Sequence, residues 1–435
     1  MGLLSILRNW LFGAPTAEPD QDAPTDRSDA PSPRPADPQE SHRPRAKSLR
    51  VRLTPQRYRG PQRTHVRNVE SQKPPYLFAF PTFGGGFLDL SQGGDPARLD
   101  QFGLPRMTTP RDLADWLQIP LGHVAWLTYR FCDSNRPQTP SESHYHFHWT
   151  RKRSGGHRLI EAPKTRLREV QSKVLREILD RVPAHPDAHG FVSGRSILTN
   201  AQPHIGQRFL VKYDLENFYP SVRYSRIVAI FRSMGYSREV AIWLARLTTS
   251  LVPTDLPTPG QRPSIALPYF GRHLPQGAPT SPALANLSAL GLDIRLSGLA
   301  RSYGLTYTRY ADDLTFSGRG RSAGALREFL PLVQQIIKQE RFRINKQKRR
   351  IVRNSQQMCV TGVVVNEKQN VSRDDYDELK AILHNCVRQG PDSQNRYKVP
   401  NFAAHLRGRI AHVEQLNPAR GARLLAEFQK IRWPS

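Results

Sequence analysis

The stretch that decides the fold reads Gly304-Leu-Thr-Tyr-Thr-Arg-Tyr310-Ala311-Asp312-Asp313-Leu314-Thr-Phe-Ser317. Aromatic and β-branched residues alternate on both sides of a short polar centre, a pattern that predicts two strands joined by a tight turn. The turn carries two adjacent carboxylates, Asp312 and Asp313. Neighbouring carboxylates repel each other unless cations neutralise them. An isolated pair would indicate only an exposed turn, so its role depends on a third acidic group.

That third group is Asp214, which ends the segment Phe209-Leu-Val-Lys-Tyr-Asp214. The residues before it have the apolar character of a buried strand, so we expect the carboxylate at the end of that strand. Three carboxylates on neighbouring strands supply the oxygen ligands that hard divalent cations prefer. Two such cations can stabilise the attacking and the leaving oxygen of a phosphoryl displacement. The residues therefore predict a two-metal site for phosphoryl transfer.

Three segments, in this order, resemble motifs A, B and C of the reverse transcriptases. They are Asp214 with Tyr219 five residues later, Leu274-Pro-Gln-Gly277 with Ser281-Pro282, and Tyr310-Ala-Asp-Asp313. The resemblance implies an RNA-directed DNA polymerase, a nucleotidyltransferase that uses dNTPs and two Mg2+ ions, for which Mn2+ can substitute. It also implies an α+β right-hand fold with fingers, a palm that carries an antiparallel sheet, and a helical thumb.

A basic hairpin is predicted at Arg151-Lys-Arg-Ser-Gly-Gly-His-Arg158-Leu-Ile-Glu-Ala-Pro163. It resembles the fingers hairpin that grips the triphosphate of the incoming nucleotide in this family. Arg158 matches the family's phosphate-binding arginine, with Lys152 or Arg153 as a helper. Guanidinium groups suit this role because they pair with phosphate oxygens in two directions.

The resemblance assigns four more residues to the nucleotide. Tyr219 matches the position whose ring excludes a ribose 2′-hydroxyl. Gln276 and Gly277 precede the motif B helix, where backbone and amide groups meet a base pair or a sugar. Lys348 follows Asn345 in a basic segment that resembles motif D. A basic segment beside a metal site is expected to contact phosphates.

Two further segments resemble signatures of the bacterial retron branch, one before motif A and one after motif D. A retron enzyme copies its own structured noncoding RNA, starts at the 2′-hydroxyl of an internal guanosine, and makes a branched RNA–DNA product called msDNA. The resemblance implies these partners, a possible effector protein and a role in antiphage defence. The residues that it assigns to RNA are Asn200 and His204, then Val360, Thr361 and Gly362, then Arg407 and Arg409.

Two alternatives stay open at this point, a standalone or group II intron-like bacterial reverse transcriptase, and a non-catalytic RNA-binding protein on the same scaffold. Only 122 residues follow Asp313, which leaves room for a thumb but not for a long maturase region. All three carboxylates and Tyr219 are present, and RNA binding alone would not need them. Incorporation of nucleotides on a primed template would separate the enzyme from the binding protein.

Composition agrees with a nucleic-acid partner. The 435 residues include 64 Lys and Arg against 37 Asp and Glu, a formal charge of +27, which favours a polyanion. Three cysteines without CxxC spacing argue against a disulfide framework and fit a reducing cytoplasm, which the resemblance implies is that of a bacterium. No apolar run reaches the roughly 18–20 residues that span a bilayer. His144, His146 and His148 are interpreted as the polar face of a strand, not as a metal site.

The chain is expected to divide into four parts. Residues 1–104 are rich in Pro and Arg and are predicted to be mostly disordered, with ordered structure beginning near residue 105. The predicted parts beyond them are the fingers at 105–208, the palm at 209–355 with interleaved fingers elements, and the thumb at 356–435. The thumb is expected to consist of three basic amphipathic helices at 374–388, 401–415 and 418–431.

Overall fold

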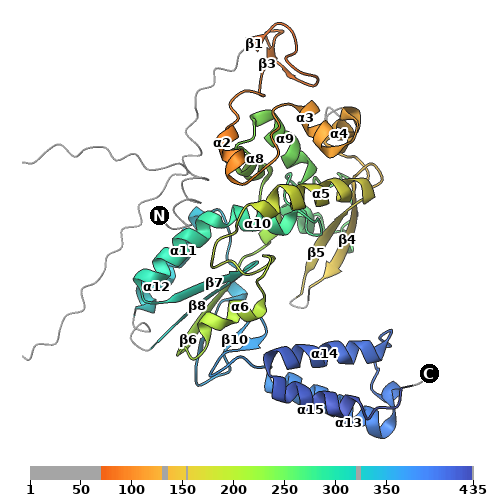
Figure 1. Ribbon diagram of the computed structural model, residues 1–435, viewed down its shortest axis with the longest axis vertical. Coiled ribbons are helices and arrows are strands. Elements are labelled where there is room, and N and C mark those ends of the chain that lie inside the picture. The colour runs from red at the N-terminus through yellow and green to blue at the C-terminus, as the bar shows by residue number, and fades with distance from the viewer. Residues whose placement is uncertain (1–69, 130–135, 153–154, 320–324, 434–435) are drawn as a thin grey trace, which may run out of the picture. The chain divides into compact units, whose positions relative to one another are not determined.

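The computed structural model describes residues 70–129, 136–152, 155–319 and 325–433. Its central sheet is antiparallel, with strand order β7-β8-β6-β9 (Figure 1). The strands are β6 (Phe209–Asp214), β7 (Thr306–Tyr310), β8 (Asp313–Gly318) and β9 (Arg350–Arg353). The predicted hairpin is confirmed as β7 and β8, and β8 pairs with β6 so that Asp313 lies opposite Asp214. The sheet therefore brings motifs A and C together.

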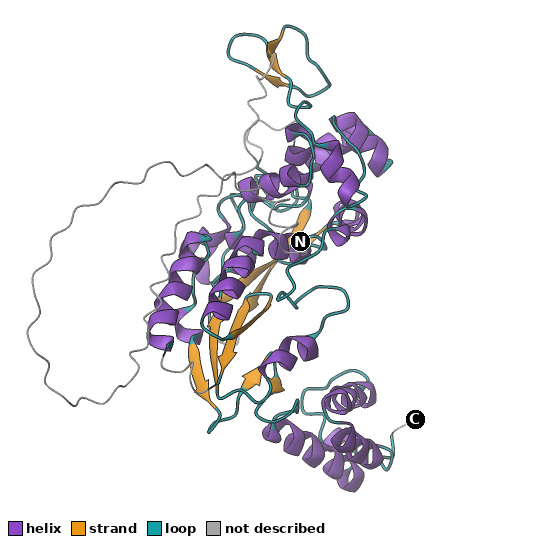
Figure 2. Ribbon diagram, turned by 60° about the vertical axis from the view of Figure 1, so that its left-hand side comes forward, coloured by secondary structure: helices purple, strands orange, loops and turns teal. Residues whose placement is uncertain are grey.

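Three helices connect and cover this sheet: α10 (Ser281–Ser288), α11 (Leu290–Ser302) and α12 (Leu326–Gln339). Pro282 lies in the first turn of α10, where the missing amide hydrogen costs nothing. Figures 1 and 2 show α11 and α12 along the sheet. The ring of Phe316 on β8 lies 5.2 Å from that of Phe329 on α12, and both are fully buried. This aromatic contact joins the helical layer to the motif C strand.

Helices and one hairpin lie on both sides of β6 in the chain. Those before it include α3 (Pro110–Leu117), α4 (Leu121–Leu127), β4 (Tyr145–Arg151), β5 (His157–Pro163) and α5 (Thr165–Glu177), and α8 (Tyr224–Ser233) and α9 (Arg238–Leu247) follow it. A capping box between Thr109 and Asp112 starts α3. The predicted basic hairpin is confirmed as β4 and β5, whose register pairs Arg151 with His157.

The C-terminal part contains a short hairpin and three helices. The hairpin is β10 (Cys359–Val360) with β11 (Val363–Val364), and the helices are α13 (Arg373–Gln389), α14 (Phe402–Leu416) and α15 (Pro418–Phe428). Leu383, Leu406 and Leu424, one from each helix, are buried in one cluster that also includes Leu210 of β6. The three predicted helices are therefore confirmed, and they share a core with the central sheet.

Ordered structure begins well before residue 105, so that expectation was wrong. β1 (Glu70–Ser71), β2 (Phe80–Pro81) and β3 (Phe87–Leu88) form a small sheet, and α2 (Pro96–Gln101) follows. Backbone hydrogen bonds hold this part to α8 and α9, among them Asp95 N to Gly235 O at 2.7 Å and Glu239 N to Leu90 O at 3.0 Å. Contacts of this kind with distant segments cannot be predicted from the amino-acid composition of the segment itself. Residues 1–69 lie outside the described residues.

No helix within the described part of the chain is both long and apolar enough to cross a membrane.

Candidate active site

The three predicted carboxylates meet at one end of the central sheet. Asp214 ends β6, Asp313 begins β8 opposite it, and Asp312 lies in the turn between β7 and β8. The amide of Leu215 donates to the carbonyl oxygen of Asp312 at 2.9 Å, which links the turn to the end of β6. The structure thus places side chains from two distant segments at one point.

Crowding of these carboxylates disfavours their charged forms. Burial, followed by the charges of Asp313 and Asp214, raises the pKa of Asp312 to about 6. Burial also raises the pKa of Asp313. The ammonium group of Lys348 lies 2.7 Å from one carboxylate oxygen of Asp214. The lysine side chain is about half exposed, and an ion pair of that kind stabilises by only about 0–1 kcal/mol, so a divalent cation can displace it.

The site is open rather than a closed metal cage. Among the described residues, no three His, Cys, Asp or Glu side chains are placed to hold a metal ion by themselves. Mg2+ is commonly held by one or two carboxylates together with substrate phosphates. The oxygen-only donor set and the raised carboxylate pKa values fit such a partly filled coordination shell, which leaves positions for oxygen ligands from outside the protein.

A cavity of about 1220 Å3 lies in front of the carboxylates. Its walls come from the β4–β5 hairpin, from the segment after β6, from the motif B loop and from the basic segment near Lys348. Six predicted site residues line it: Arg158, Asp214, Tyr219, Gln276, Asp312 and Lys348. The structure therefore brings most of the predicted metal and nucleotide residues to one pocket, whereas Asp313 and Gly277 do not line it.

The side of this cavity formed by the β4–β5 hairpin is cationic. Arg158 on β5 is exposed, and Lys152 is half-buried at the end of β4. Burial and the positive charges of Arg158 and Lys348 lower the pKa of Lys152. Arg153 lies outside the described residues. Cations that face a carboxylate cluster across a cavity provide a place for a triphosphate.

Tyr219 stands in α7 (Phe218–Ser221), the short helix after β6. It is partly buried, and its ring lies 5.7 Å from that of Phe218. Burial and the charge of Asp312 raise the pKa of Tyr219 to about 12, so the phenol is neutral. The ring thus lines the same cavity as Asp214 and Asp312.

The motif B loop is held against β5 by a buried pair that the sequence analysis missed. The amide of Glu161 donates to the carbonyl oxygen of Gln276 at 2.8 Å. Gly277 has φ 129°, and a Cβ there would lie 3.1 Å from the carbonyl oxygen of Glu161. His273 Nε2 lies 2.9 Å from Glu161 Oε2, and both side chains are fully buried. A lone acidic residue between apolar neighbours in Leu159-Ile-Glu-Ala was the signal.

The first retron-like signature is buried, which contradicts direct RNA contact by its two side chains. Asn200 belongs to α6 (Ile197–Ala201) and is 1% exposed. His204 is fully buried, with one ring nitrogen 2.6 Å from Ser317 Oγ and the other 2.8 Å from Thr308 Oγ1. Burial also lowers the pKa of His204 to about 3, so the ring is neutral. These residues therefore pack against one face of the β7–β8 hairpin and stabilise it.

The second signature forms the turn of the β10–β11 hairpin. Thr361 and Gly362 have φ values of 48° and 87°, and Gly362 is exposed. Val360 is fully buried, which contradicts RNA contact by its side chain. Asn200 Nδ2 donates to Thr361 Oγ1 at 3.3 Å. The two signatures therefore contact each other, and only the turn is available to a ligand.

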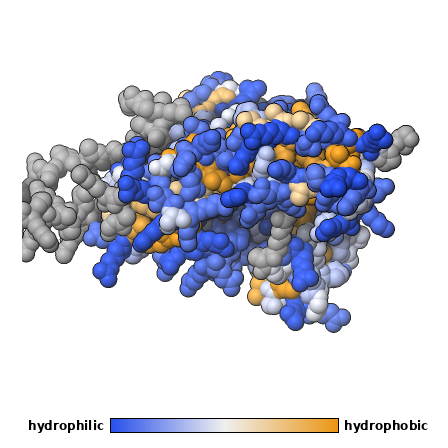
Figure 3. All heavy atoms as spheres, turned by 90° about the horizontal axis from the view of Figure 1, so that it is seen from below, coloured by the Kyte–Doolittle hydropathy of each residue, from blue (hydrophilic) through white to orange (hydrophobic). Residues whose placement is uncertain are grey.

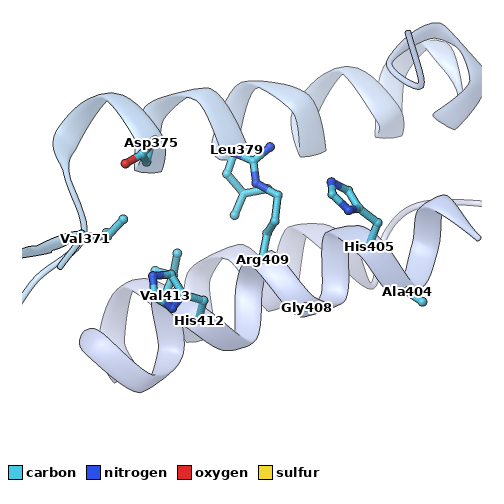
Figure 4. Close-up of a pocket in the computed structure, with 10 residues that line it drawn as sticks. Val371, Asp375, Leu379, Ala404, His405, Gly408, Arg409, His412 and Val413 are labelled. Carbon is cyan, nitrogen blue, oxygen red and sulfur yellow. The ribbon is translucent and has the colours of Figure 1, made fainter. Parts of the chain in front are cut away.

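A groove of about 560 Å3, here called the helical groove, runs between α13 and α14 beside this turn (Figure 4). Arg409 points across it from α14, and its guanidinium donates to Glu378 of α13 at 2.9 Å. His405 and His412 also line the groove, whereas Arg407 does not and pairs with Glu414 at 3.6 Å. Only one of the two predicted arginines thus faces the groove.

Metal binding is expected to depend on pH through Asp312. Its pKa is about 6 in the folded chain against an ordinary 3.8. In the metal-free protein, the favourable contribution of Asp312 to the free energy of unfolding is therefore fully present below the ordinary aspartate pKa, and it is lost as the pH rises through about 6. Because Mg2+ needs the ionised form, we expect Mg2+ to raise Tm more at about pH 7.5 than at about pH 5. Calorimetry of the protein and of Asp312→Asn checks this, and equal shifts of the unaltered protein at both pH values would contradict it.

Known proteins resemble this chain over most of its length. A family model described as reverse transcriptase (RNA-dependent DNA polymerase) matches residues 150–365. The Retron Mx65 reverse transcriptase of Myxococcus xanthus is 40% identical over 337 residues, which cover 76% of this chain and 73% of that protein. The Retron Mx162 reverse transcriptase of the same organism is 35% identical over 76% of this chain and 68% of its own length. The Retron Ec86 reverse transcriptase of Escherichia coli is 32% identical over 77% and 92%. The chain therefore belongs to the retron reverse transcriptases and is an RNA-directed DNA polymerase.

Proposed function

We propose that this polymerase copies a cognate structured noncoding RNA from an internal 2′-hydroxyl and makes branched RNA-linked DNA. Family membership supports this proposal. The observation that carries it is the register of β6 and β8, which sets Asp214 opposite Asp313, at the edge of a cavity lined by Asp214, Asp312, Arg158 and Tyr219. That arrangement suits metal-dependent nucleotide addition and selection of deoxynucleotides.

In this proposal Asp214 and Asp312 bind two Mg2+ ions, and Asp313 completes the site. The ions would lower the pKa of the attacking hydroxyl and neutralise the pyrophosphate leaving group. Arg158 would bind the triphosphate, with Lys152 beside it. Lys348 would exchange its contact with Asp214 for one with the nucleotide phosphates. Tyr219 would exclude the 2′-hydroxyl of a ribonucleotide, and Gln276 would border the base pair.

We also propose that the C-terminal part is a thumb whose helical groove binds RNA. The groove presents Arg409, His405 and His412 beside the exposed turn at Gly362. Small residues at Ala404 and Gly408 leave space for a nucleic-acid backbone. Seen from below, the surface is mostly hydrophilic, with scattered apolar patches between polar residues (Figure 3). Folded RNA offers unpaired bases and 2′-hydroxyls to such a surface.

The proposed boundaries are fingers to residue 208, palm at 209–355 and thumb from 356. The elements at residues 70–101 precede the expected start of the fingers.

The effector protein and the antiphage role implied by the resemblance stay predictions. A plaque assay with the gene and its neighbours in a susceptible bacterial host checks them.

RNA-linked DNA tests the proposal directly. We expect cells that express the gene with its upstream flanking DNA to contain small DNA whose mobility changes on debranching or RNase treatment, and cells with Asp312→Asn to lack it. Arg409→Gln should lower the yield severalfold while extension of an annealed primer is retained, because backbone contacts add affinity for the RNA. Arg373→Gln is the matched control, since Arg373 is exposed on α13 outside the groove.

Two outcomes would overturn this assignment. If no RNA-linked DNA forms although the purified protein extends ordinary primers, the chain is a standalone reverse transcriptase. If Arg409→Gln and Arg373→Gln lower the yield equally, the helical groove is not the RNA contact.

A further inference from the structure

Arg309 on β7 is buried beside the turn that carries the catalytic carboxylates. Its guanidinium donates through Nε and Nη2 to the two carboxylate oxygens of Asp293 on α11, at 2.7 and 2.6 Å. Both side chains are completely buried. Tyr307 Oη donates to the same carboxylate at 2.8 Å. The charge of Arg309 is thus matched within the core, and one of its amino groups is left for another partner.

That amino group, Nη1, holds the turn itself. It donates to the carbonyl oxygen of Ala311 at 3.0 Å and to Asn286 Oδ1 on α10 at 2.9 Å. Ala311 has φ 54°, a left-handed conformation that a residue with a side chain disfavours. The bond to its carbonyl fixes the peptide that leads into Asp312. Arg309 therefore restrains the backbone next to a proposed metal ligand.

The opposite side of the turn is closed by Gly190. Asn286 Nδ2 donates to the carbonyl oxygen of Gly190 at 2.9 Å, so one amide bridges Gly190 and Arg309. A Cβ on Gly190 would lie only 2.6 Å from the amide nitrogen of Ala311. The backbone of Arg309 exchanges hydrogen bonds of 2.7 Å with Asp187 and His189. The turn therefore lies between the Arg309 guanidinium and Gly190, and the close approach of Gly190 to Ala311 leaves no room for a Cβ atom.

The same guanidinium also reaches motif A. Its central carbon lies 5.9 Å from the centre of the Phe218 ring, and Phe218 precedes Tyr219. Arg309 thus contacts Phe218 within motif A, Asn286 on the helix that follows motif B, and Ala311 of motif C. A group that only filled the core would not need these partners, because a buried ion pair can often be replaced by apolar residues without loss of stability.

We propose that Arg309 is a positioning residue, which holds the Ala311 peptide so that Asp312 and Asp313 can bind their metal ions. The planar fork of arginine is needed because it binds Asp293 with one edge and offers Nη1 to the turn. A lysine keeps the charge but cannot reach both partners with one ammonium group. This inference rests on the proposed metal-binding role of Asp312 and Asp313.

The test compares Arg309→Lys with Tyr307→Phe. We expect Arg309→Lys to lower kcat about 100-fold, the scale of a misplacement of about 1 Å at a reacting centre. The Mg2+ concentration for half-maximal rate should rise, with the KM for primed template unchanged. Tyr307→Phe removes a hydrogen bond to the same Asp293 but none to the turn. It should lower Tm yet keep kcat and the Mg2+ dependence near those of the unaltered protein.

A folded Arg309→Lys protein with unaltered kcat and Mg2+ dependence would overturn the inference. The inference would also be overturned if Tyr307→Phe lost as much activity as Arg309→Lys and if, in both variants, the loss followed the decrease in Tm. If Arg309→Lys does not fold, the double variant Arg309→Met/Asp293→Leu replaces the buried pair with apolar groups. That variant should fold and be inactive, and full activity in it would overturn the inference. Asp312→Asn is measured alongside, because activity in Asp312→Asn would refute the metal-site assignment instead.

Discussion

Replacement of Asp312 or Asp313 by asparagine is expected to abolish primer extension while the protein stays folded. An amide cannot supply the negative charge that neutralises a divalent cation, so stabilisation of the transition state is lost. We expect a decrease of about 1000-fold or more, at the upper end of what one preorganised electrostatic group contributes. Single-turnover extension of a primed RNA template in Mg2+ measures it.

The fold should tolerate these substitutions because the carboxylates are crowded. Burial and the charges of Asp313 and Asp214 raise the pKa of Asp312 to about 6, so a neutral side chain relieves repulsion in the metal-free protein at neutral pH. Tm of Asp312→Asn without Mg2+ should therefore equal or exceed that of the unaltered protein. A double variant that extends primers at the unaltered rate, with Mg2+ as the only metal, would refute the site.

Replacement of Tyr219 by valine is expected to admit ribonucleotides. The neutral ring is packed in the cavity beside Asp214 and Asp312, and its removal opens space where a 2′-hydroxyl would lie. A packed wall rejects one added hydroxyl by about 100-fold, so the ratio of kcat/KM for dNTP over rNTP should fall by about that factor. Steady-state incorporation of matched dGTP and GTP measures the ratio.

Phe218 provides the control for this prediction. Its ring is buried against Tyr219 and Phe342, so Phe218→Leu should lower stability without a large change in sugar selection. An unchanged ratio in Tyr219→Val, together with a changed ratio in Phe218→Leu, would show that Phe218 is the selecting residue.

The sequence predicted those helices and strands that follow from a pattern of neighbouring residues. The hairpin around Asp312 follows from alternation of aromatic and β-branched residues, and β6 follows from its apolar run. Pro282 signals the start of α10, and the C-terminal helices follow from their apolar spacing. The three carboxylates were predictable because Asp214 ends one of these strands, Asp313 begins another, and Asp312 lies in the turn between two of them.

Contacts between distant segments explain what the sequence did not predict. Tyr307, Thr308 and Arg309 are all buried on β7, because α11 covers one face and the segment with His204 covers the other. Thr308 and Arg309 therefore resemble exposed polar positions in the sequence but are core residues. His204 was assigned to RNA from the resemblance to a retron signature, and nothing local shows that Ser317 and Thr308 bind it instead.

The central claim is that Asp214, Asp312 and Asp313 hold the metal ions of nucleotide addition. The most direct test is anomalous diffraction from Mn2+ in crystals of the protein with a primed template and an incoming dNTP. The account predicts two Mn2+ peaks within coordination distance, about 2.2 Å, of the carboxylate oxygens of Asp214 and Asp312. Lys348 should then be displaced from Asp214. Mn2+ bound elsewhere, with nucleotide in the cavity and these carboxylates free, would contradict the account.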